Sequence, residues 1–208
     1  MISELEGWLH TDTQKEAFKS LEKLDEILSL IPTDVYQWKW ALIVLHNCAQ
    51  AFMVLALEGT NQVEVVKNRK EYAECLNKLS QGEEMDDEMK KKLSSTQLDY
   101  FLNLYSKIKD TNNTPFLWRK NEFQSTDEQD DAMALLNEYR NEFIHFSPGS
   151  WGIELSGIPR ICASAMDVIR FMINNGNFMY QFSDAEKVRI QDLITSIDQK
   201  LGAVGYGK

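Results

Sequence analysis

Apolar residues recur every three or four positions along most of this chain, and hardly any segment alternates apolar and polar residues as a half-buried strand does. This spacing places the apolar side chains on one face of a helix. Two runs show it most clearly: Phe18, Leu21, Leu24, Ile27, Leu28 and Ile31, and then Met133, Leu136, Tyr139, Phe143 and Ile144. The sequence therefore predicts an all-α fold in which amphipathic helices pack around one core.

Capping residues and prolines give the expected helix boundaries. The first helix is predicted to begin after a cap at Thr11 or Asp12 and to run to about Ile31. Pro32 ends it, because proline lacks the backbone N–H that continuing the helix requires.

The second predicted helix is the most apolar part of the chain. Asp34 is its expected cap, and Gly59 follows its last apolar residue as a C-terminal stop. The apolar stretch from Ala41 to Leu57 is short for a membrane span and contains three polar residues. We therefore expect the buried central helix of a bundle.

Three further signals mark the second half of the chain. Ser125 with Glu128 three residues later predicts a capping box that opens a helix ending near Phe146. Pro159 suits the first turn of the next helix, and Asp184 is expected to start the last one.

These helices predict a single helical domain over residues 1–208, with four to five core helices and additional peripheral helices. Residues 60–115 are polar and irregular in pattern, so we expect a more variable helical insertion there. Residues 202–208 are rich in glycine and predict a flexible tail.

Composition narrows the function classes. The net charge is −10, which argues against broad nonspecific nucleic-acid binding, although it leaves room for a local basic site. The three cysteines, Cys48, Cys75 and Cys162, have no zinc or redox spacing, and we predict reduced thiols in a cytoplasmic protein. The first residues do not contain a basic patch followed by an apolar run, so we expect no signal peptide.

The segment from Arg140 to His145 holds the strongest functional signal. Arginine can hold a phosphate, and histidine can move a proton near neutral pH. Five helical steps place Arg140 and His145 about 140° apart, so a joint site is expected to need a distorted last turn or a second copy of the motif. Asn141 and His145 are four apart and share a face. The alternative is an ordinary helix end, at which His145 binds the last carbonyl groups.

The segment 135–146, with its R-N-x-x-x-H motif from Arg140 to His145, resembles the signature helix of HEPN domains. In that family an arginine, usually followed by a polar residue such as asparagine, precedes a histidine by four to six positions. Residues 38–52 also look like an early HEPN helix, an apolar helix with a short His-Asn element at His46 and Asn47. The resemblance extends over about residues 33–175.

This resemblance implies a helical bundle that forms a homodimer. In catalytic HEPN members the motifs of two protomers meet and cut RNA without a metal or cofactor, often in toxin or phage-defence systems with an antitoxin or nucleotidyltransferase partner. Arg140 and His145 would be catalytic and Asn141 would support them. The alternative is a non-catalytic HEPN-like module that binds a nucleotide, RNA or a protein, since a fold does not determine an activity. A purely structural bundle is the third reading.

Other polar groups have plainer explanations. His46, Asn47 and Gln50 form a stripe for which a buried hydrogen-bonded network is expected, with a place beside His145 as the sharper alternative. The acidic run 127–131 fits a helix dipole better than a metal site. Trp151 is expected to pack against the bundle, with base stacking as its alternative role. The sequence has no glycine-rich phosphate loop, nucleophile elbow or zinc spacing.

Overall fold

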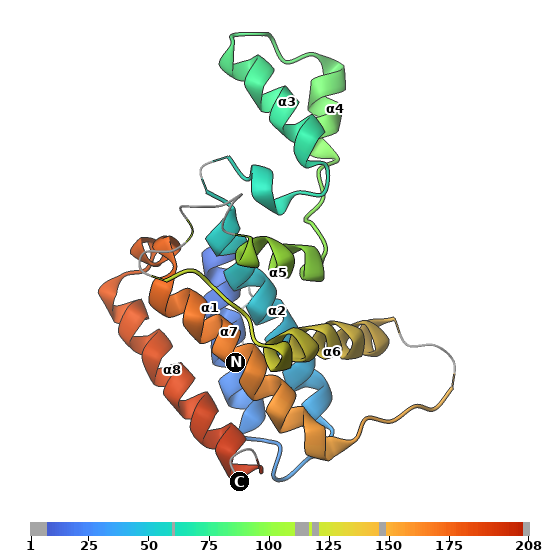
Figure 1. Cartoon of the computed structure of the whole chain (residues 1–208), viewed down its shortest axis with the longest axis vertical. Coiled ribbons are helices and arrows are strands. Elements are labelled where there is room, and N and C mark those ends of the chain that lie inside the picture. Colours follow the sequence, from blue (N-terminus) through green and yellow to red (C-terminus); the bar gives the residue numbers. More distant parts are fainter. Residues whose placement is uncertain (1–7, 60, 111–116, 118–120, 146–148, 206–208) are drawn as a thin grey trace, which may run out of the picture.

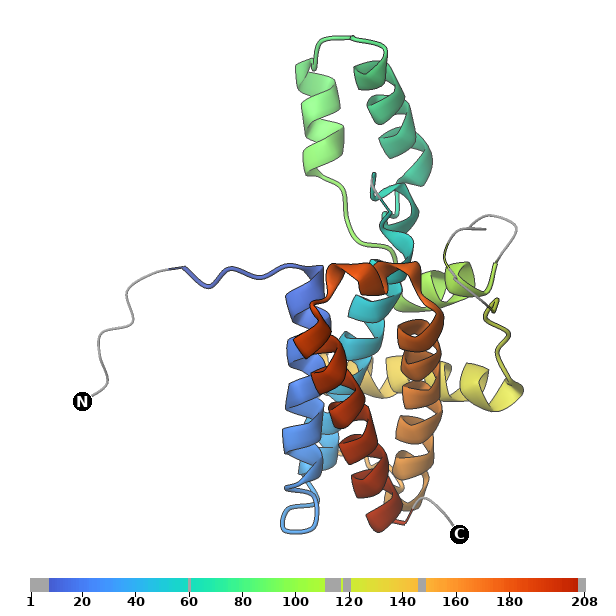
Figure 2. The ribbon, with the colours of Figure 1, turned by 90° about the vertical axis from the view of Figure 1, so that its left-hand side faces the viewer.

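The structure is a computed structural model, and it describes residues 8–59, 61–110, 117, 121–145 and 149–205. Within these residues the fold has eight α-helices and no strands, so the predicted all-α class is confirmed. Figures 1 and 2 show α1 (Thr13–Leu28), α2 (Gln37–Leu57), α7 (Ile158–Asn175) and α8 (Asp184–Ala203) alongside one another, with α6 (Asp127–Ile144) lying across them.

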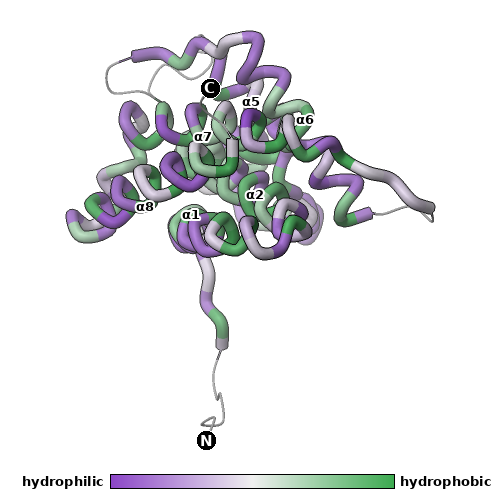
Figure 3. The backbone as a smooth tube through the Cα atoms, turned by 90° about the horizontal axis from the view of Figure 1, so that it is seen from below, coloured by the Kyte–Doolittle hydropathy of each residue, from purple (hydrophilic) through white to green (hydrophobic). Residues whose placement is uncertain are grey.

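Helix α2 lies at the centre of this bundle. It contacts α1, α5 (Phe101–Lys109), α6 and α7. Most of its side chains are buried, and Phe52 and Leu45 are fully inaccessible to solvent. Seen from below in Figure 3, hydrophobic turns face the inside of the bundle and hydrophilic turns the outside. Burial of apolar surface on a helix that is apolar nearly all round is therefore the main force that holds the fold together.

By length and composition alone, α2 could also cross a membrane. In this structure 67% of its most apolar window is buried inside the protein. A buried core helix, which is what the sequence predicts for this segment, has the same combination of properties. The cytoplasmic location stays a prediction.

The predicted boundaries of α1 and α2 are partly confirmed. Asp12 is the cap of α1, and its carboxylate accepts a hydrogen bond from the backbone N–H of Lys15 at 2.7 Å. The helix ends at Leu28, so the expected end at Ile31 was wrong: residues 29–33, which include Pro32, form turns. Gly59 has a φ of +50°, the left-handed conformation that suits a glycine stop.

The cap of α6 lies one residue later than predicted. Thr126 accepts from the backbone of Gln129 at 3.2 Å, and the side chain of Gln129 accepts from the backbone of Thr126 at 3.0 Å. The predicted pair Ser125 and Glu128 was therefore wrong: Thr126 and Gln129 satisfy the first backbone groups, and the helix starts at Asp127. The helix ends at Ile144, and the expected end at Phe146 lies outside the described residues.

Helices α7 and α8 begin as expected. Pro159 is in the first turn of α7, where its missing N–H costs nothing. Asp184 opens α8 behind a capping box formed by Ser183 and Glu186. Helix α8 continues through Ala203, past the expected start of the tail at residue 202; residues 206–208 lie outside the described part.

The predicted insertion at 60–115 divides into two parts, with residues 60 and 111–115 outside the described part. Helices α3 (Arg69–Ser80) and α4 (Asp87–Ser94) form a hairpin that stands off the bundle in Figure 2. Helix α5 instead packs on α2 and α6 and belongs to the core. A single antiparallel bridge between Val66 and Leu98 joins the two ends of the hairpin.

Candidate functional site

A surface groove of about 680 Å³ runs between α6, α2 and the start of α5, and we call it the α6 groove. Helix α6 contributes Asn137, Arg140, Asn141 and His145 to its wall. The other walls are His46 and Gln50 of α2 and residues 99–103. All three predicted site residues, Arg140, Asn141 and His145, therefore line one groove of a single chain.

The expected 140° separation did not keep Arg140 and His145 apart. On a helical wheel centred on Asn137, Arg140 lies about 60° to one side, while Asn141 and His145 lie about 40° and 80° to the other. The two residues are thus the edges of one broad helix face. His145 is the C-terminal cap of α6, with a φ of −105° that departs from helical values.

The side chain of Arg140 is held toward the middle of this face. Its Nη1 donates a hydrogen bond to Oδ1 of Asn141 at 3.0 Å. Neighbouring residues on a helix normally point in different directions, so this bond bends the long arginine side chain toward Asn141.

The charge of Arg140 is balanced differently from that of the other arginines. In the described part of the chain, each of the other arginines forms an ion pair with Asp or Glu: Arg69, Arg160, Arg170 and Arg189. Arg140, half-buried in the groove, has none among the described residues. In a protein of net charge −10, an unpaired guanidinium beside two amides suits an anion from outside the chain.

His46 forms the floor of the groove. It is buried, its Nε2 lies 3.3 Å from Oδ1 of Asn137, and its ring stacks on Phe101 with centroids 4.0 Å apart. Burial lowers the pKa of His46 to about 4, the hydrogen bond to Asn137 opposes this shift, and the charge of Arg140 adds to it. At neutral pH the imidazole is therefore uncharged and can hold the amide of Asn137 in place.

The predicted polar stripe of α2 divides between two sides. His46 belongs both to a buried hydrogen-bonded pair and to the groove with His145, so the two alternatives hold together. Gln50 also lines the groove. Asn47 faces α1 instead, where its Nδ2 donates to Oγ of Ser20 at 2.7 Å.

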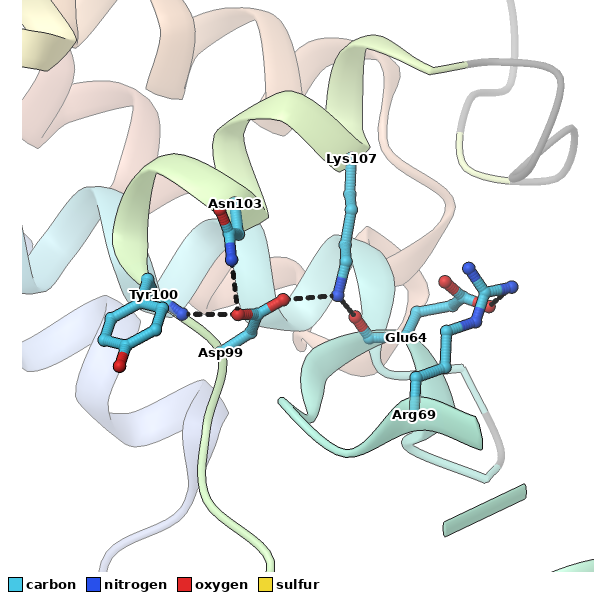
Figure 4. Close-up of polar contacts among 6 residues, drawn as sticks. All are labelled: Glu64, Arg69, Asp99, Tyr100, Asn103 and Lys107. Carbon is cyan, nitrogen blue, oxygen red and sulfur yellow. Dashed lines mark hydrogen bonds and ion pairs between the residues drawn. The ribbon is translucent and has the colours of Figure 1, made fainter. Parts of the chain in front are cut away.

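The carboxylate of Asp99 lines the groove, but its negative charge is already balanced by a positive side chain. Figure 4 shows Asp99 accepting hydrogen bonds from the backbone of Tyr100, from Asn103 and from Lys107, at 2.8, 2.8 and 2.7 Å. Burial alone would raise the pKa of Asp99, but these donors outweigh burial and lower it. The carboxylate therefore stays ionised and paired with Lys107.

His145 is exposed at the rim. Its backbone N–H donates to the carbonyl of Asn141 at 2.9 Å, and within the described residues its imidazole makes no hydrogen bond. The side-chain bonds to carbonyls expected of an ordinary helix end are thus absent from this part of the chain. A free imidazole at the groove edge can exchange protons with a bound molecule.

Sequence reasoning missed Asn137, Asp99 and Asn103. Asn137 precedes Asn141 by four residues, a spacing that signals a shared helix face. No signal in the sequence places Asp99 and Asn103 here, because they reach the groove only through the packing of α5 on α2.

The acidic run at the start of α6 complements the helix dipole and is paired in part with side chains of α5. Asp127, Glu128 and Asp130 occupy the first turn, as expected for the helix dipole. Oδ1 of Asp130 accepts hydrogen bonds from Tyr105 and Lys109 at 2.8 and 2.9 Å. Among the residues that the structure describes, no group of three or more His, Cys, Asp or Glu side chains is placed to hold a metal ion.

Comparison of the chain with protein-family models, curated proteins and solved structures found no match.

Proposed function

We propose that this protein is a HEPN-like, metal-independent endoribonuclease that acts as a homodimer, with Arg140, Asn141 and His145 at the reacting phosphate. The observation that carries the proposal is the guanidinium of Arg140, which has no carboxylate partner among the described residues and shares the α6 groove with His145 and with the amides of Asn137 and Asn141. A cation, amide donors and a proton carrier are groups that promote the cleavage of a phosphodiester.

The reaction would proceed within the RNA strand. The 2′-hydroxyl oxygen bonds to the adjacent phosphorus while its proton passes to a neutral imidazole. The bond from phosphorus to the 5′ oxygen breaks, and that oxygen takes a proton from an imidazolium. A cyclic phosphate and a 5′-hydroxyl result, and no further reactant is consumed. Arg140 would stabilise the charge that develops on the phosphate oxygens.

A second copy of the chain would supply the second imidazole. His46 lies in the groove but is buried and uncharged at neutral pH, so we assign it a positioning role rather than that of the acid. Tyr100 and Leu102 line the groove and are 65% and 40% exposed, and Ile144 beside it is 46% exposed. These apolar side chains support a dimer that closes over the groove.

The alternative is a non-catalytic module that binds a nucleotide, RNA or a protein partner through Arg140. It is favoured by the imidazole of His145, which no hydrogen bond orients within the described residues. Catalytic histidines are usually held by a partner group.

RNA cleavage in the presence of EDTA separates the two. We expect wild-type protein to cleave RNA, and Arg140→Ala and His145→Ala each to lose at least about a hundredfold of the rate. Arg189→Ala and His10→Ala remove the same side chains from exposed positions outside the groove and should cleave as wild type. Wild-type binding without cleavage supports the module, and equal rates in all variants exclude both roles for Arg140 and His145.

A further inference from the structure

A second groove, of about 490 Å³, lies on the other side of α6. We call it the aromatic groove and define it by Tyr36, Lys39, Phe143 and Trp151. Phe143 projects about 120° away from Asn137 around the helix, so α6 forms a wall of each groove with different faces. The two grooves share no lining residue.

The rings of this groove are open to solvent. Phe143 and Trp151 are in contact, with ring centroids 4.9 Å apart and planes inclined by 48°. Trp151 is 43% exposed and Tyr36 is 60% exposed. Aromatic side chains that serve only to pack a loop are expected to bury more of their surface. The expected packing of Trp151 against the bundle is thus only half realised.

Lys39 adds a positive charge beside these rings. Its ammonium lies 5.6 Å from the ring centroid of Tyr36, 5.1 Å from that of Trp40 and 5.7 Å from that of Phe143. The side chain is half-buried and donates a hydrogen bond to the hydroxyl of Tyr36 at 3.4 Å. In the part of the chain that the structure describes, it forms no ion pair with a carboxylate. The groove, which Glu142 also lines, thus combines exposed ring faces with an ammonium that pairs with no carboxylate among the described residues.

We propose that the aromatic groove binds a base of single-stranded RNA, stacked on Trp151 and Tyr36, while Lys39 contacts the adjoining phosphate. Flat apolar rings accept any base, and the cation complements the strand's charge. A paired base in a duplex cannot enter such a groove, which restricts the ligand to unpaired RNA.

This inference rests on the proposed function, because it names the substrate class of the α6 groove. Helix α6 separates the two grooves and is about 10 Å across with its side chains, so one short strand can occupy both. The phosphate at Arg140 would be cut, and a neighbouring base in the aromatic groove would fix the strand's position.

Binding can be measured apart from cleavage with a fluorescently labelled short RNA whose riboses are 2′-O-methylated, so that it cannot be cut. A strand of the same length without bases, retaining the sugar–phosphate backbone, is the matched ligand. Full-length wild type, Trp151→Ala, Tyr36→Ala and Lys39→Gln are titrated by fluorescence anisotropy. Trp8→Ala and Tyr180→Ala are the controls, because these residues are 89% and 77% exposed and line neither groove.

We expect Trp151→Ala and Tyr36→Ala to weaken binding of the base-bearing strand about tenfold or more and to leave the abasic strand unaffected. Lys39→Gln should weaken binding of both strands. Tyr36 is exposed enough that its removal leaves the fold intact, which circular dichroism verifies. Unchanged affinities in the aromatic variants, equal wild-type affinity for both strands, or no RNA binding would each overturn the inference.

The proposed function can fail separately. If the aromatic variants lose binding and no preparation cleaves RNA, the base site stands and the nuclease does not. If wild type cleaves RNA and the aromatic variants bind it normally, only the base site is wrong. A change of molecular mass in light scattering, with RNA affinity unchanged, would make the aromatic groove a protein interface and also overturn the inference.

Discussion

The guanidinium of Arg140 donates to the side-chain carbonyl of its sequence neighbour Asn141 at 3.0 Å, across the face of α6 that lines the groove. This bond brings the cation toward the amides at the centre of the face. It also leaves the remaining guanidinium donors available, because an amide oxygen occupies only one or two of them.

Asn141→Asp and Asn141→Ala should therefore differ. The aspartate would add a negative charge next to Arg140 and form an ion pair, which competes with a phosphate. We expect RNA affinity to fall by about ten- to a hundredfold in Asn141→Asp and by less than about tenfold in Asn141→Ala. Anisotropy with uncleavable RNA measures both. A greater loss in the alanine variant would show that the amide, and not the free charge of Arg140, matters.

The burial of His46 predicts a pH dependence of stability. Its pKa is lowered to about 4 in the folded protein and is near 6.5 in the unfolded chain. The unfolded chain therefore binds the proton first, and the stability that the neutral ring contributes is lost as pH falls from about 6.5 to about 4. The loss is on the order of 3 kcal/mol.

Urea unfolding of wild type and His46→Leu at several pH values between 4 and 7.5 tests this directly. The difference between the two proteins isolates His46 from carboxylates that titrate in the same range. We expect the variant to lose less stability than wild type toward acid pH. Parallel curves for the two proteins would mean that the buried imidazole is not linked to folding.

Much of the fold was readable from local signals. The cap at Asp12 satisfies a backbone group within one turn of the chain, the start of α8 at Asp184 follows a local capping box, and the stop at Gly59 has a left-handed φ, so the sequence alone indicates all three. The all-α class follows from the periodicity of apolar residues.

Other boundaries depend on tertiary contacts. Helix α5 begins only at Phe101, because the residues before it include Leu98, which pairs with Val66 across the base of the hairpin. Val66 and Leu98 lie far apart in the sequence, so their pairing is not visible in a local window.

The candidate site likewise contains some residues that local sequence indicates and others that only tertiary contacts bring together. Arg140, Asn141 and His145 are neighbours in the sequence and were found together. His46 and Asn137 are 91 residues apart, and only the packing of α2 on α6 makes them a pair. The motif is therefore visible in the sequence, whereas the groove around it depends on the fold.

The ion pair between Asp99 and Lys107 is expected to stabilise the base of the hairpin formed by α3 and α4. Asp99 is 9% exposed, and Lys107 also donates to the carbonyl of Glu64 at 2.7 Å, as Figure 4 shows. Lys107→Met would leave the carboxylate without its cation, which we expect to cost about 2 kcal/mol. The exposed pair of Lys187 with Asp184 is the control, and Lys187→Met should cost less than about 0.5 kcal/mol.

Chemical denaturation gives both values, and limited trypsin digestion reports on the hairpin itself. We expect faster cleavage within residues 67–94 in Lys107→Met than in Lys187→Met. Equal stability and equal digestion of the two variants would show that the bridge between Val66 and Leu98 alone holds the base.

Gly176 is required where α7 meets the short 3₁₀ helix Asn177–Gln181. A Cβ atom at this position would lie 2.5 Å from the carbonyl oxygen of Met172 and would also overlap the ring of Phe178. The backbone N–H of Gly176 donates to that same carbonyl at 2.7 Å, so the oxygen cannot move away without breaking the end of α7. We expect Gly176→Ala to destabilise the protein by about 1–3 kcal/mol.

Gly202→Ala is the matched control, because it lies in α8 with nothing within 4 Å of its Cβ and should gain up to about 1 kcal/mol of stability. Thermal unfolding of the two variants decides the matter: a melting temperature for Gly176→Ala at or above that of wild type would mean that Phe178 and the end of α7 rearrange freely.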